Sequence, residues 1–533
     1  MPPDHPSSAP YAPPEQQYLA DTTPAHRKRY GQFFTPAPLA RLMGDWLLGA
    51  DHLRTVLEPA FGLGVFSRHL LAQKPALQVE GYEIDPVMRQ AARACFAGQP
   101  QLALHATDYV YAPWEARYDG IICNPPYAKF HDYDNRPALA ELATHTGYEL
   151  NGFTNLYAIF LLKSLHQLAP GGRAAYLIPS EFLNADYGKR VKQYLLDSGY
   201  LRWVTVIDFR ETIFADALTT ACLVLLARDA HDDQVAFTSL ARPEELAAWA
   251  EELASYPQWP AQRVYPRASL VPAIKWRRYY QPVASEKFRG LIPFSQVAKV
   301  SRGIATGANA YFMFNREKAD QHDIPAANLL PCIAKATDVP APFFTQDHFD
   351  QLAARNRNVW LFNGQHQPDE RVAAYLQVGI DRGIDQRYLT SKRNPWYALE
   401  QRPPAPIWVS VFNRNGLRFV RNEAMVRNLT TFHCVYLNLF SAAQPDLLFA
   451  YLLTPVSREM FDDNRREYGN GLQKFEPNDL NQAMMLDLAS LPAPVVEETL
   501  ARYHAYRTSV LQGVPDATLL NSIDQGFRHH FGA

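Results

Sequence analysis

The sequence predicts an α/β protein with a doubly wound, mostly parallel sheet, followed by a C-terminal domain of mixed α+β structure. Two observations predict the sheet. Between residues 26 and 228, short apolar or β-branched segments alternate with longer amphipathic segments, and acidic residues stand at the ends of several short segments. Strands that alternate with helices are typical of a parallel sheet covered on both faces. After about residue 275 this alternation stops, and short strands, aromatic clusters and loops are expected instead.

Six segments of the first region have the composition of buried strands, and four longer segments have the amphipathic pattern of helices. The later region contains three further strand candidates. The expected strands are 54–58, 77–83, 119–123, 172–178, 203–209 and 221–226, the expected helices are 64–74, 86–97, 155–167 and 186–198, and the later strands are 310–314, 407–412 and 432–439.

The chain is longer than one typical domain, so its 533 residues predict two or three domains. Residues 1–25 contain seven prolines and few apolar residues, which predicts a mobile N-terminal arm. We expect an α/β domain over residues 26–230, a linker with a surface helix over residues 231–270, and a second domain over residues 271–533.

Composition indicates a globular protein, since 47% of the residues are hydrophobic and 20% are charged. The formal net charge of −2 gives no global argument for a polyanionic partner. Basic residues are nevertheless concentrated locally. Residues 275–316 contain eight Lys or Arg and one acid, and residues 391–427 contain seven and two. Local patches of this kind are what a nucleic-acid-binding cleft needs.

The five cysteines are far apart and form no CxxC pair, so neither a metal site nor a disulfide framework is predicted. The first residues do not have the basic-then-apolar pattern of a signal peptide, and the chain has no run of 18 apolar residues. We therefore expect a cytoplasmic protein with no membrane segment.

A glycine-rich loop follows the first expected strand, in the sequence Leu-Glu-Pro-Ala-Phe-Gly-Leu-Gly. Glycines allow a sharp turn and a close approach of backbone to ligand, and the next helix presents free N–H groups. The third glycine of a dinucleotide loop and the lysine of a nucleotide-triphosphate loop are both missing. The loop therefore favours another nucleoside cofactor, with Glu58, Ala60, Gly62 and Gly64 as candidate contacts.

Acidic residues also follow the next two expected strands. Glu83 ends the second strand and can accept hydrogen bonds from both ribose hydroxyls of a nucleoside. Asp108 stands after a further short strand and can accept from an adenine amino group. Open α/β sheets bind ligands at the carboxyl ends of their strands, where these residues gather. Ile84 and Tyr109, their neighbours in sequence, complete the candidate cofactor set.

The most specific motif is Asn124-Pro125-Pro126-Tyr127, directly after the apolar segment 119–123. The two prolines remove N–H donors and stiffen the turn, so carbonyl oxygens can point into a site unpaired. The Asn124 carbonyl and a neighbouring backbone carbonyl offer two acceptors to an –NH₂ group. Such acceptors localise the lone pair of a ring-attached amine, which is otherwise a poor nucleophile. Tyr127 offers a ring on which a base can stack.

Together these motifs resemble the amino-methyltransferases of restriction–modification systems, of the TaqI-like adenine-N6 group. The resemblance is close over residues 26–228. The segment Arg-Tyr-Gly-Gln-Phe-Phe-Thr-Pro at residues 29–36 resembles the family's first motif and precedes the glycine loop, as in the gamma arrangement of motifs. The resemblance implies the Rossmann-like fold of methyltransferases that use S-adenosylmethionine, with a target-recognition domain last and no metal.

The resemblance also implies roles for individual residues. Thr35 would contact the methionine end of the cofactor, Glu83 the ribose and Asp108 the adenine. Asn124, which also borders the cofactor, and Pro125 would accept from the target amine. Tyr127 would stack on one face of a flipped base, and Phe214, in a motif at residues 210–214, would close the other face.

In the second domain, residues 301–312 resemble a segment found near the start of recognition domains in these enzymes. Other polar and aromatic loops also look able to reach DNA, because Arg and Asn can contact base edges while Lys and Arg neutralise phosphates. The candidate DNA contacts are Arg302, Thr306, Asn309, Trp396, Arg414, Asn415 and Lys474.

We therefore expect a DNA methyltransferase that modifies the N6 amine of a flipped adenine in double-stranded DNA. It would work in a bacterial or archaeal cell, with a separate cognate restriction endonuclease as a possible partner. Three alternatives stay open at this point: cytosine-N4 methylation at the same site, methylation of protein glutamine, and a non-catalytic specificity subunit. The Asn at position 124 favours adenine, since the family more often has Ser there for cytosine.

Overall fold

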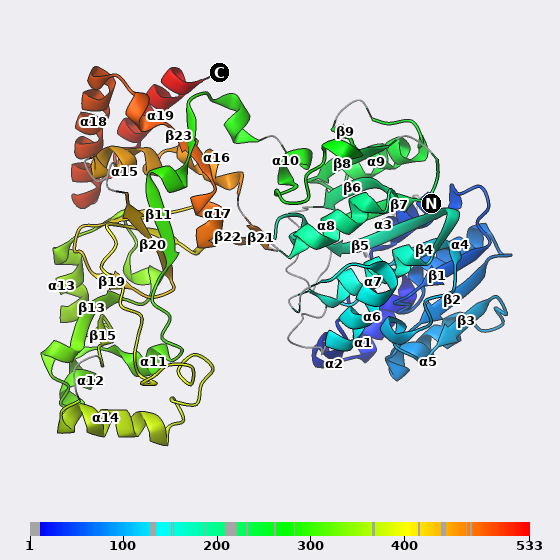
Figure 1. Ribbon diagram of the computed structural model, residues 1–533, viewed down its shortest axis with the longest axis horizontal. Coiled ribbons are helices and arrows are strands. Elements are labelled where there is room, and N and C mark those ends of the chain that lie inside the picture. The colour runs from blue at the N-terminus through cyan, green and yellow to red at the C-terminus, as the bar shows by residue number, and fades with distance from the viewer. Residues whose placement is uncertain are drawn as a thin grey trace, which may run out of the picture. The chain divides into compact units, whose positions relative to one another are not determined.

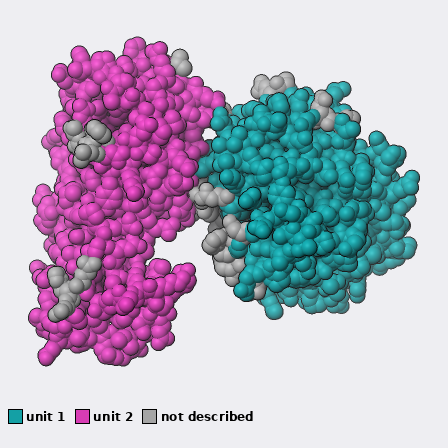
Figure 2. Space-filling view, viewed as in Figure 1, with its two compact units in different colours: residues 1–282, 467–471 teal, residues 283–466, 472–533 magenta. Residues whose placement is uncertain are grey.

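The computed structural model describes residues 11–127, 135–150, 152, 154–185, 187–207, 221–230, 233–260, 263–281, 283–364, 368–413, 416–438, 444–464, 466–468 and 472–532. The chain divides into two compact units. Figure 2 shows the first unit, residues 1–282 with 467–471, in teal, and the second unit, residues 283–466 with 472–533, in magenta.

The first unit is built on one twisted sheet, in which the described strands run in the order β3-β2-β1-β4-β5-β7-β6-β8-β9 (Figure 1). Neighbouring strands from β3 to β5 are parallel, whereas β7 is antiparallel to both β5 and β6. The strands are β1 (Thr55–Glu58), β2 (Gln78–Tyr82), β3 (Leu102–His105), β4 (Tyr118–Cys123), β5 (Leu168–Pro179), β6 (Leu201–Ile207), β7 (Ala221–Ala227), β8 (Gln234–Leu240) and β9 (Val264–Pro266).

Helices cover both faces of this sheet, and the alternation of side chains along the strands separates two cores. In β4, Ile121 belongs to one core with α7, while Ile122 belongs to the other with α3 and α4. The expected doubly wound α/β fold is thus confirmed. The helices are α1 (Pro13–Asp21), α2 (Pro24–Tyr30), α3 (Ala37–Leu48), α4 (Val65–Gln73), α5 (Pro86–Cys95), α6 (Arg136–Thr146), α7 (Leu156–His166), α8 (Gly188–Asp197), α9 (Glu245–Ala254) and α10 (Arg277–Tyr280).

The ends of the first unit differ from the expectation. Residues 13–21, expected to be a mobile arm, form helix α1, and Tyr18 on this helix is buried. Residues 231–270, expected to be a linker, contain the surface helix α9 but also supply β8 and β9 to the sheet. Both strands pair with their neighbours in regular register. The expectation of a linker rested on composition, which does not show whether a segment pairs with a sheet formed by other strands.

The second unit combines small sheets with helices. The larger sheets among its described strands have the orders β11-β20-β16-β18-β14 and β12-β15-β13-β19. Of the segment 310–314, expected to be a strand, residues 310–312 belong to the short helix α11, which begins with a hydrogen bond from the Tyr311 N–H to the Ala308 carbonyl oxygen, and residues 313–314 form strand β12. The expected strands at 407–412 and 432–439 are confirmed as β16 and β20.

The strands after β9 are β10 (Leu291–Pro293), β11 (Ala298–Arg302), β12 (Met313–Phe314), β13 (Leu329–Ile333), β14 (Phe343–Phe344), β15 (Trp360–Phe362), β16 (Ile407–Ser410), β17 (Phe412–Asn413), β18 (Phe419–Asn422), β19 (Arg427–Asn428), β20 (Phe432–Leu437), β21 (Arg466–Tyr468), β22 (Leu472–Lys474) and β23 (Met484–Leu486). The helices are α11 (Asn309–Phe312), α12 (Arg316–Gln321), α13 (Gln346–Ala354), α14 (Glu370–Asp381), α15 (Pro445–Leu453), α16 (Pro455–Asp462), α17 (Pro477–Asn481), α18 (Ala493–Leu511) and α19 (Ala517–Phe531). Within the described part of the chain, none of the helices combines the length and the apolar character that a membrane span requires.

Candidate cofactor and target-amine site

The motif residues of the first unit gather at the carboxyl edge of its sheet. Glu58 ends β1, Glu83 directly follows β2, Asp108 comes after β3, and Asn124 directly follows β4. These four strands are adjacent and parallel, in the order β3-β2-β1-β4. The structure therefore brings together residues that are far apart in sequence, as ligand sites of open α/β sheets require.

The glycine loop after β1 has the backbone shape that only glycine adopts easily. Gly62 and Gly64 have φ angles of 56° and 68°, in the left-handed region. A Cβ at Gly64 would lie 2.6 Å from the rings of Phe61 and Phe96, so this position excludes any side chain. At Gly62, by contrast, no described atom lies within 4 Å of the Cβ position. The loop thus leaves open space beside Gly62, next to the partly buried Ala60.

Glu58 is wholly buried below this loop. One carboxylate oxygen accepts hydrogen bonds from the backbone N–H of Ser67, at 3.2 Å, and from the Ser67 hydroxyl. Burial raises the pKa of Glu58 to about 8, against the lowering effect of those hydrogen bonds. The other carboxylate oxygen is buried and has no hydrogen-bond partner among the described residues. An acceptor of this kind is free to meet a donor or a cation.

Glu83 links the two loops that follow β1 and β2. Its carboxylate oxygens accept from the backbone N–H groups of Gly62, at 3.0 Å, and Asp85, at 2.8 Å. Burial raises the pKa of Glu83 to about 7. The adjacent Ile84 is 48% exposed.

Asp108 and Tyr109 lie at the end of β3. Asp108 is partly exposed, and its carboxylate caps the next short helical turn by accepting from the backbone N–H of Val110 at 3.0 Å. Tyr109 is buried, and its hydroxyl donates to Gln167 at 2.6 Å. The Tyr109 side chain therefore belongs to the core, which limits any ligand contact of this residue to its backbone.

Asn124 has a fixed amide orientation. Its Nδ2 group donates to the carbonyl oxygen of Phe33 at 2.8 Å and to the hydroxyl of the buried Thr35 at 3.0 Å. A carbonyl oxygen can only accept, so the nitrogen of the amide must face Phe33. The amide oxygen Oδ1 is consequently turned the other way, and it is buried with no hydrogen-bond partner among the described residues. An unpaired buried acceptor normally costs about 1–3 kcal/mol, and a ligand group that donates to Oδ1 would remove that cost.

The aromatic part of the motif is held equally firmly. The Tyr127 hydroxyl donates to the carbonyl oxygen of Leu177 in β5 at 3.3 Å. Its ring stacks on Phe33, with 5.2 Å between ring centroids and 26° between planes. Pro125, which lies between Asn124 and Tyr127 in the sequence, is buried. Phe214 and its motif at residues 210–214 lie outside the described residues.

The N-terminal helices attach to this edge through one buried carboxylate, which sequence reasoning did not identify. Asp85 accepts hydrogen bonds at one oxygen from the side chains of Tyr18, His26 and Gln32, at 3.0, 2.7 and 2.7 Å. Burial alone would raise the pKa of Asp85, but these hydrogen bonds and one from the backbone N–H of Val87 hold it below its usual range. Sequence analysis could not reveal this role, because Asp85 also has the position of an ordinary N-cap of helix α5.

A second link joins the same helices to the glycine loop. The buried Glu15 of α1 pairs with Arg68 at 2.6 Å, and Arg68 also donates to the carbonyl oxygen of Leu63 at 2.6 Å. Leu63 packs against Tyr18 in a small core of its own. The residues expected to be a mobile arm thus cover the glycine loop and hold the segment that orients Asn124.

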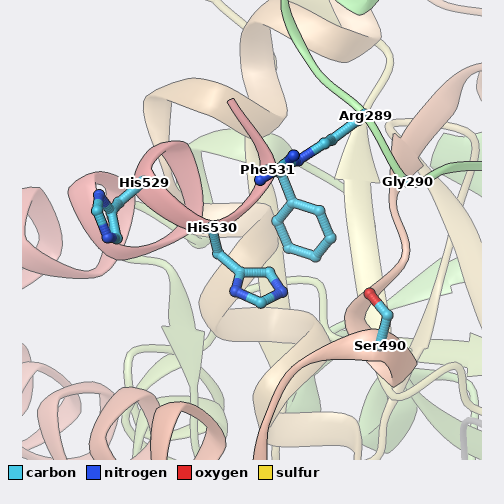
Figure 3. A pocket seen from close by; sticks show the side chains of 6 residues that line it. All are labelled: Arg289, Gly290, Ser490, His529, His530 and Phe531. Atoms are coloured by element: carbon cyan, nitrogen blue, oxygen red, sulfur yellow. The ribbon is translucent and has the colours of Figure 1, made fainter. Parts of the chain in front are cut away.

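The described residues form a cavity of about 490 Å³ in the second unit, away from these motifs in sequence (Figure 3). Figure 3 shows that its lining comes from three segments: Arg289 and Gly290, Ser490, and His529 to Phe531 at the end of α19. Most of these side chains are exposed. Within the described ranges, no three or more His, Cys, Asp or Glu side chains are placed to hold a metal ion.

The expected DNA contacts in the second unit have different surroundings. Arg302 is exposed and pairs with Glu476 at 2.9 Å, and Lys474 pairs with the same carboxylate at 2.6 Å. Thr306 is buried and bonds to the exposed Asn309. Trp396 packs with Tyr311 and Phe312, and Arg414 and Asn415 lie outside the described residues. Thr306 is therefore buried, whereas Trp396 is only partly buried, and a role of either residue in DNA contact stays a prediction.

Comparisons with known proteins find relatives over most of the chain. The N-6 DNA methylase family matches residues 16–251, and the C-terminal domain of the Type II methyltransferase M.Eco57I matches residues 279–513. The chain is 49% identical to the Type II methyltransferase M.AccI of Acinetobacter calcoaceticus over 96% of this chain and 95% of that protein. It is 25% identical to M.XamI of Xanthomonas campestris pv. amaranthicola, over 87% and 86% of the two chains.

Among solved structures, the ATP-dependent Type ISP restriction-modification enzyme LlaBIII bound to DNA shares the fold. Its TM-score is 0.50 and its sequence identity 11%, over 93% of this chain and 41% of that one. Fold and motifs together define a methyltransferase that uses S-adenosylmethionine. The chain belongs to the N-6 DNA methylase family, among the Type II DNA methyltransferases of restriction-modification systems. The alternatives of cytosine-N4 and glutamine methylation are not favoured by these relatives.

The Asp85 cluster makes a testable prediction about the N-terminal helices. Asp85→Asn replaces one acceptor oxygen with an NH₂ group, which donates and cannot accept. At least one of the surrounding donors then loses its acceptor, and an unpaired buried donor costs about 1–3 kcal/mol. We expect hydrogen exchange of residues 13–34 to become roughly tenfold faster or more, while β4 and β5 keep their protection.

Asp45→Asn is the matched control, because Asp45 also pairs with a histidine, His69, at 2.7 Å but is 65% exposed. Its exchange pattern should equal that of the wild type. Equal exchange of residues 13–34 in the two variants would show that Asp85 does not fasten the helices.

Proposed function

We propose that this enzyme methylates the N6 amine of an adenine flipped out of duplex DNA, and that Asn124 and Pro125 are the acceptors for that amine. The observation that carries the proposal is the free, buried Oδ1 of Asn124, held in place by Phe33 and Thr35. An –NH₂ group that donates to this oxygen would satisfy the acceptor. The first unit would be the catalytic domain and the second the target-recognition domain.

The residues at the carboxyl edge of the sheet have chemical properties that suit S-adenosylmethionine. The open space beside Gly62 allows the backbone to approach a ligand closely. Glu83 would accept from ribose hydroxyls, and the exposed Ile84 beside it would offer an apolar surface to a base. Asp108 would take the adenine amine. The free oxygen of Glu58 and the hydroxyl of Thr35 would face the cationic methionine end.

When bound, the cofactor supplies a methyl group that is already activated by a sulfonium centre. The chain's own residues then have to orient the acceptor of that methyl group. Two hydrogen bonds to carbonyl oxygens at position 124 and at Pro125 would draw the amine protons out of the ring plane. The nitrogen lone pair then points away from them, and positioning of this kind lowers the barrier without a strong general base.

Tyr127 would hold the base that carries the amine. Its hydroxyl is fastened to Leu177 and its ring to Phe33, so the aromatic surface is set before any base arrives. Stacking on such a ring is worth roughly 1–3 kcal/mol, comparable to the few kcal/mol that extruding a base costs. Phe214 would contribute a second aromatic face.

We further propose that the enzyme is the modification half of a restriction–modification pair, with a separate nuclease and a cytoplasmic location. Membership of the Type II family supports this proposal. In such a pair, the methyltransferase and the nuclease recognise the same DNA sequence, and methylation protects that sequence in the host DNA from the nuclease. A non-catalytic specificity subunit would bind DNA and transfer nothing, so the purified protein with cofactor distinguishes the two directly.

Substitution of Asn124 tests the catalytic assignment. Asn124→Ala removes the oriented acceptor and should reduce the turnover number by roughly 100- to 1000-fold, as loss of an oriented hydrogen-bonding group does in other enzymes. Cofactor affinity should change little. Turnover is measured as N6-methyladenine, by mass spectrometry of digested DNA, so a cytosine-N4 product would also be seen.

Asn184→Ala provides the control. Asn184 is also a partly buried asparagine of the first unit with two hydrogen bonds, to Tyr280 and Arg277, but it stands outside the motifs. Its variant should turn over like the wild type. Wild-type turnover by Asn124→Ala would exclude Asn124 as the acceptor.

The raised pKa of Glu58 predicts pH-dependent cofactor binding. With a pKa of about 8, Glu58 is mostly protonated at neutral pH in the free enzyme, and a cationic ligand favours its ionised form. Binding of S-adenosylmethionine should therefore release a proton and become tighter as pH rises from about 6 to about 9.

Calorimetry in two buffers of different ionisation enthalpy measures the proton release. Glu58→Gln cannot ionise, so it should bind more weakly and lose the steepest part of the pH dependence. The expectation is wrong if wild type and Glu58→Gln show the same pH profile.

A further inference from the structure

The loop that follows α14 has one face built into the second unit and one face turned outward. On the inner side, Thr390 is wholly buried, and its hydroxyl donates to the carbonyl oxygens of Ile384 and Arg387. Further along, Arg393 donates to the carbonyl oxygens of Ala305 and Thr306, the latter at 2.9 Å. The contacts of Arg393 join the loop to the segment 301–312, which resembles the start of a recognition domain.

The outer side of the loop carries a cation and an aromatic ring together. Tyr388 is 74% exposed, and the ammonium group of Lys392 lies 3.8 Å from the centroid of its ring. Leu389, beside it, is also exposed, at 38%, and packs against Gly307. Arg387 is exposed as well. Tyr388 therefore combines a highly exposed ring with a cation at one of its faces, on a loop whose inner side is fixed by hydrogen bonds.

The charge of this surface selects the class of partner. Residues 386–393 contain Arg387, Lys392 and Arg393 and no acidic residue, although Asp385 directly precedes them. Cations interleaved with an exposed aromatic ring suit a polyanion that also presents flat or apolar groups, and nucleic acid has both phosphates and sugar or base surfaces.

We propose that residues 386–393 form a DNA-contact loop of the second unit, in which Lys392 and Arg387 meet backbone phosphates and Tyr388 packs on sugar or base. This inference rests on the proposed function, the methylation of duplex DNA, and it assigns one loop of the second unit to the surface that binds the DNA. The loop lies against the segment that contains the buried Thr306, because Arg393 donates to the carbonyl oxygens of Ala305 and Thr306.

Salt-dependent DNA binding by the full-length enzyme tests the proposal, with linear plasmid fragments that the wild type methylates. Lys392→Ala should lower the slope of log affinity against log salt concentration by about one, because one phosphate contact is lost. Tyr388→Ala should weaken binding roughly 5- to 150-fold at every salt concentration with the slope unchanged. Lys335→Ala, at another exposed lysine of the second unit, should leave both quantities unchanged.

Thermal unfolding and cofactor affinity show whether each variant is folded. If a variant folds poorly, chemical labelling of lysines in the wild-type enzyme tests the same proposal. DNA should protect Lys392, but not Lys335, from an amine-reactive reagent. Wild-type binding by both loop variants, or equal labelling of Lys392 with and without DNA, overturns the assignment of the loop. Failure of the wild type to bind or methylate DNA at all would instead overturn the proposed function.

Discussion

The hydrogen bond from the Asn124 amide to the Phe33 carbonyl is the interaction on which the rest of the site depends. A carbonyl can accept but not donate, so this contact alone decides which end of the amide faces the interior. Thr35 adds a second acceptor to the same nitrogen. The free Oδ1 then follows as a consequence, and with it an acceptor that is desolvated before the amine arrives. An acceptor oriented in advance does not have to reorganise during the reaction.

This orientation depends in turn on the residues before α3. Phe33 and Thr35 belong to the segment that Gln32 ties to Asp85, and Asp85 lies two residues after Glu83, at the cofactor edge. The same Phe33 lends its ring to Tyr127. One short segment therefore contacts the loop of the proposed ribose acid and both functional groups of the target site. Its helices, α1 and α2, are fastened by buried polar contacts rather than by a large apolar face, which explains the low hydrophobicity that suggested a mobile arm.

Much of the catalytic unit could be predicted from the sequence, because its strands are short apolar runs that end in chemically informative residues. The six predicted strands correspond to β1, β2, β4, β5, β6 and β7. The predictions were weaker where tertiary contacts decide the structure. Strands β8 and β9 depend on pairing with a sheet already formed, and the role of Asp85 depends on three donors from distant positions. In the second unit, the ring contact between Trp396 and Tyr311 joins positions far apart in the sequence, so the residues adjacent to Trp396 in the sequence do not predict it.

The most direct measurement is the crystal structure of the enzyme with a cofactor analogue and a duplex that it methylates. The account predicts that Oδ1 of Asn124 lies about 2.7–3.2 Å from the N6 atom of an extruded adenine, with Nδ2 still on the Phe33 carbonyl. It is contradicted if the amide is reversed or turned away from N6, or if the adenine stays stacked in the duplex while the amine of another base occupies the site.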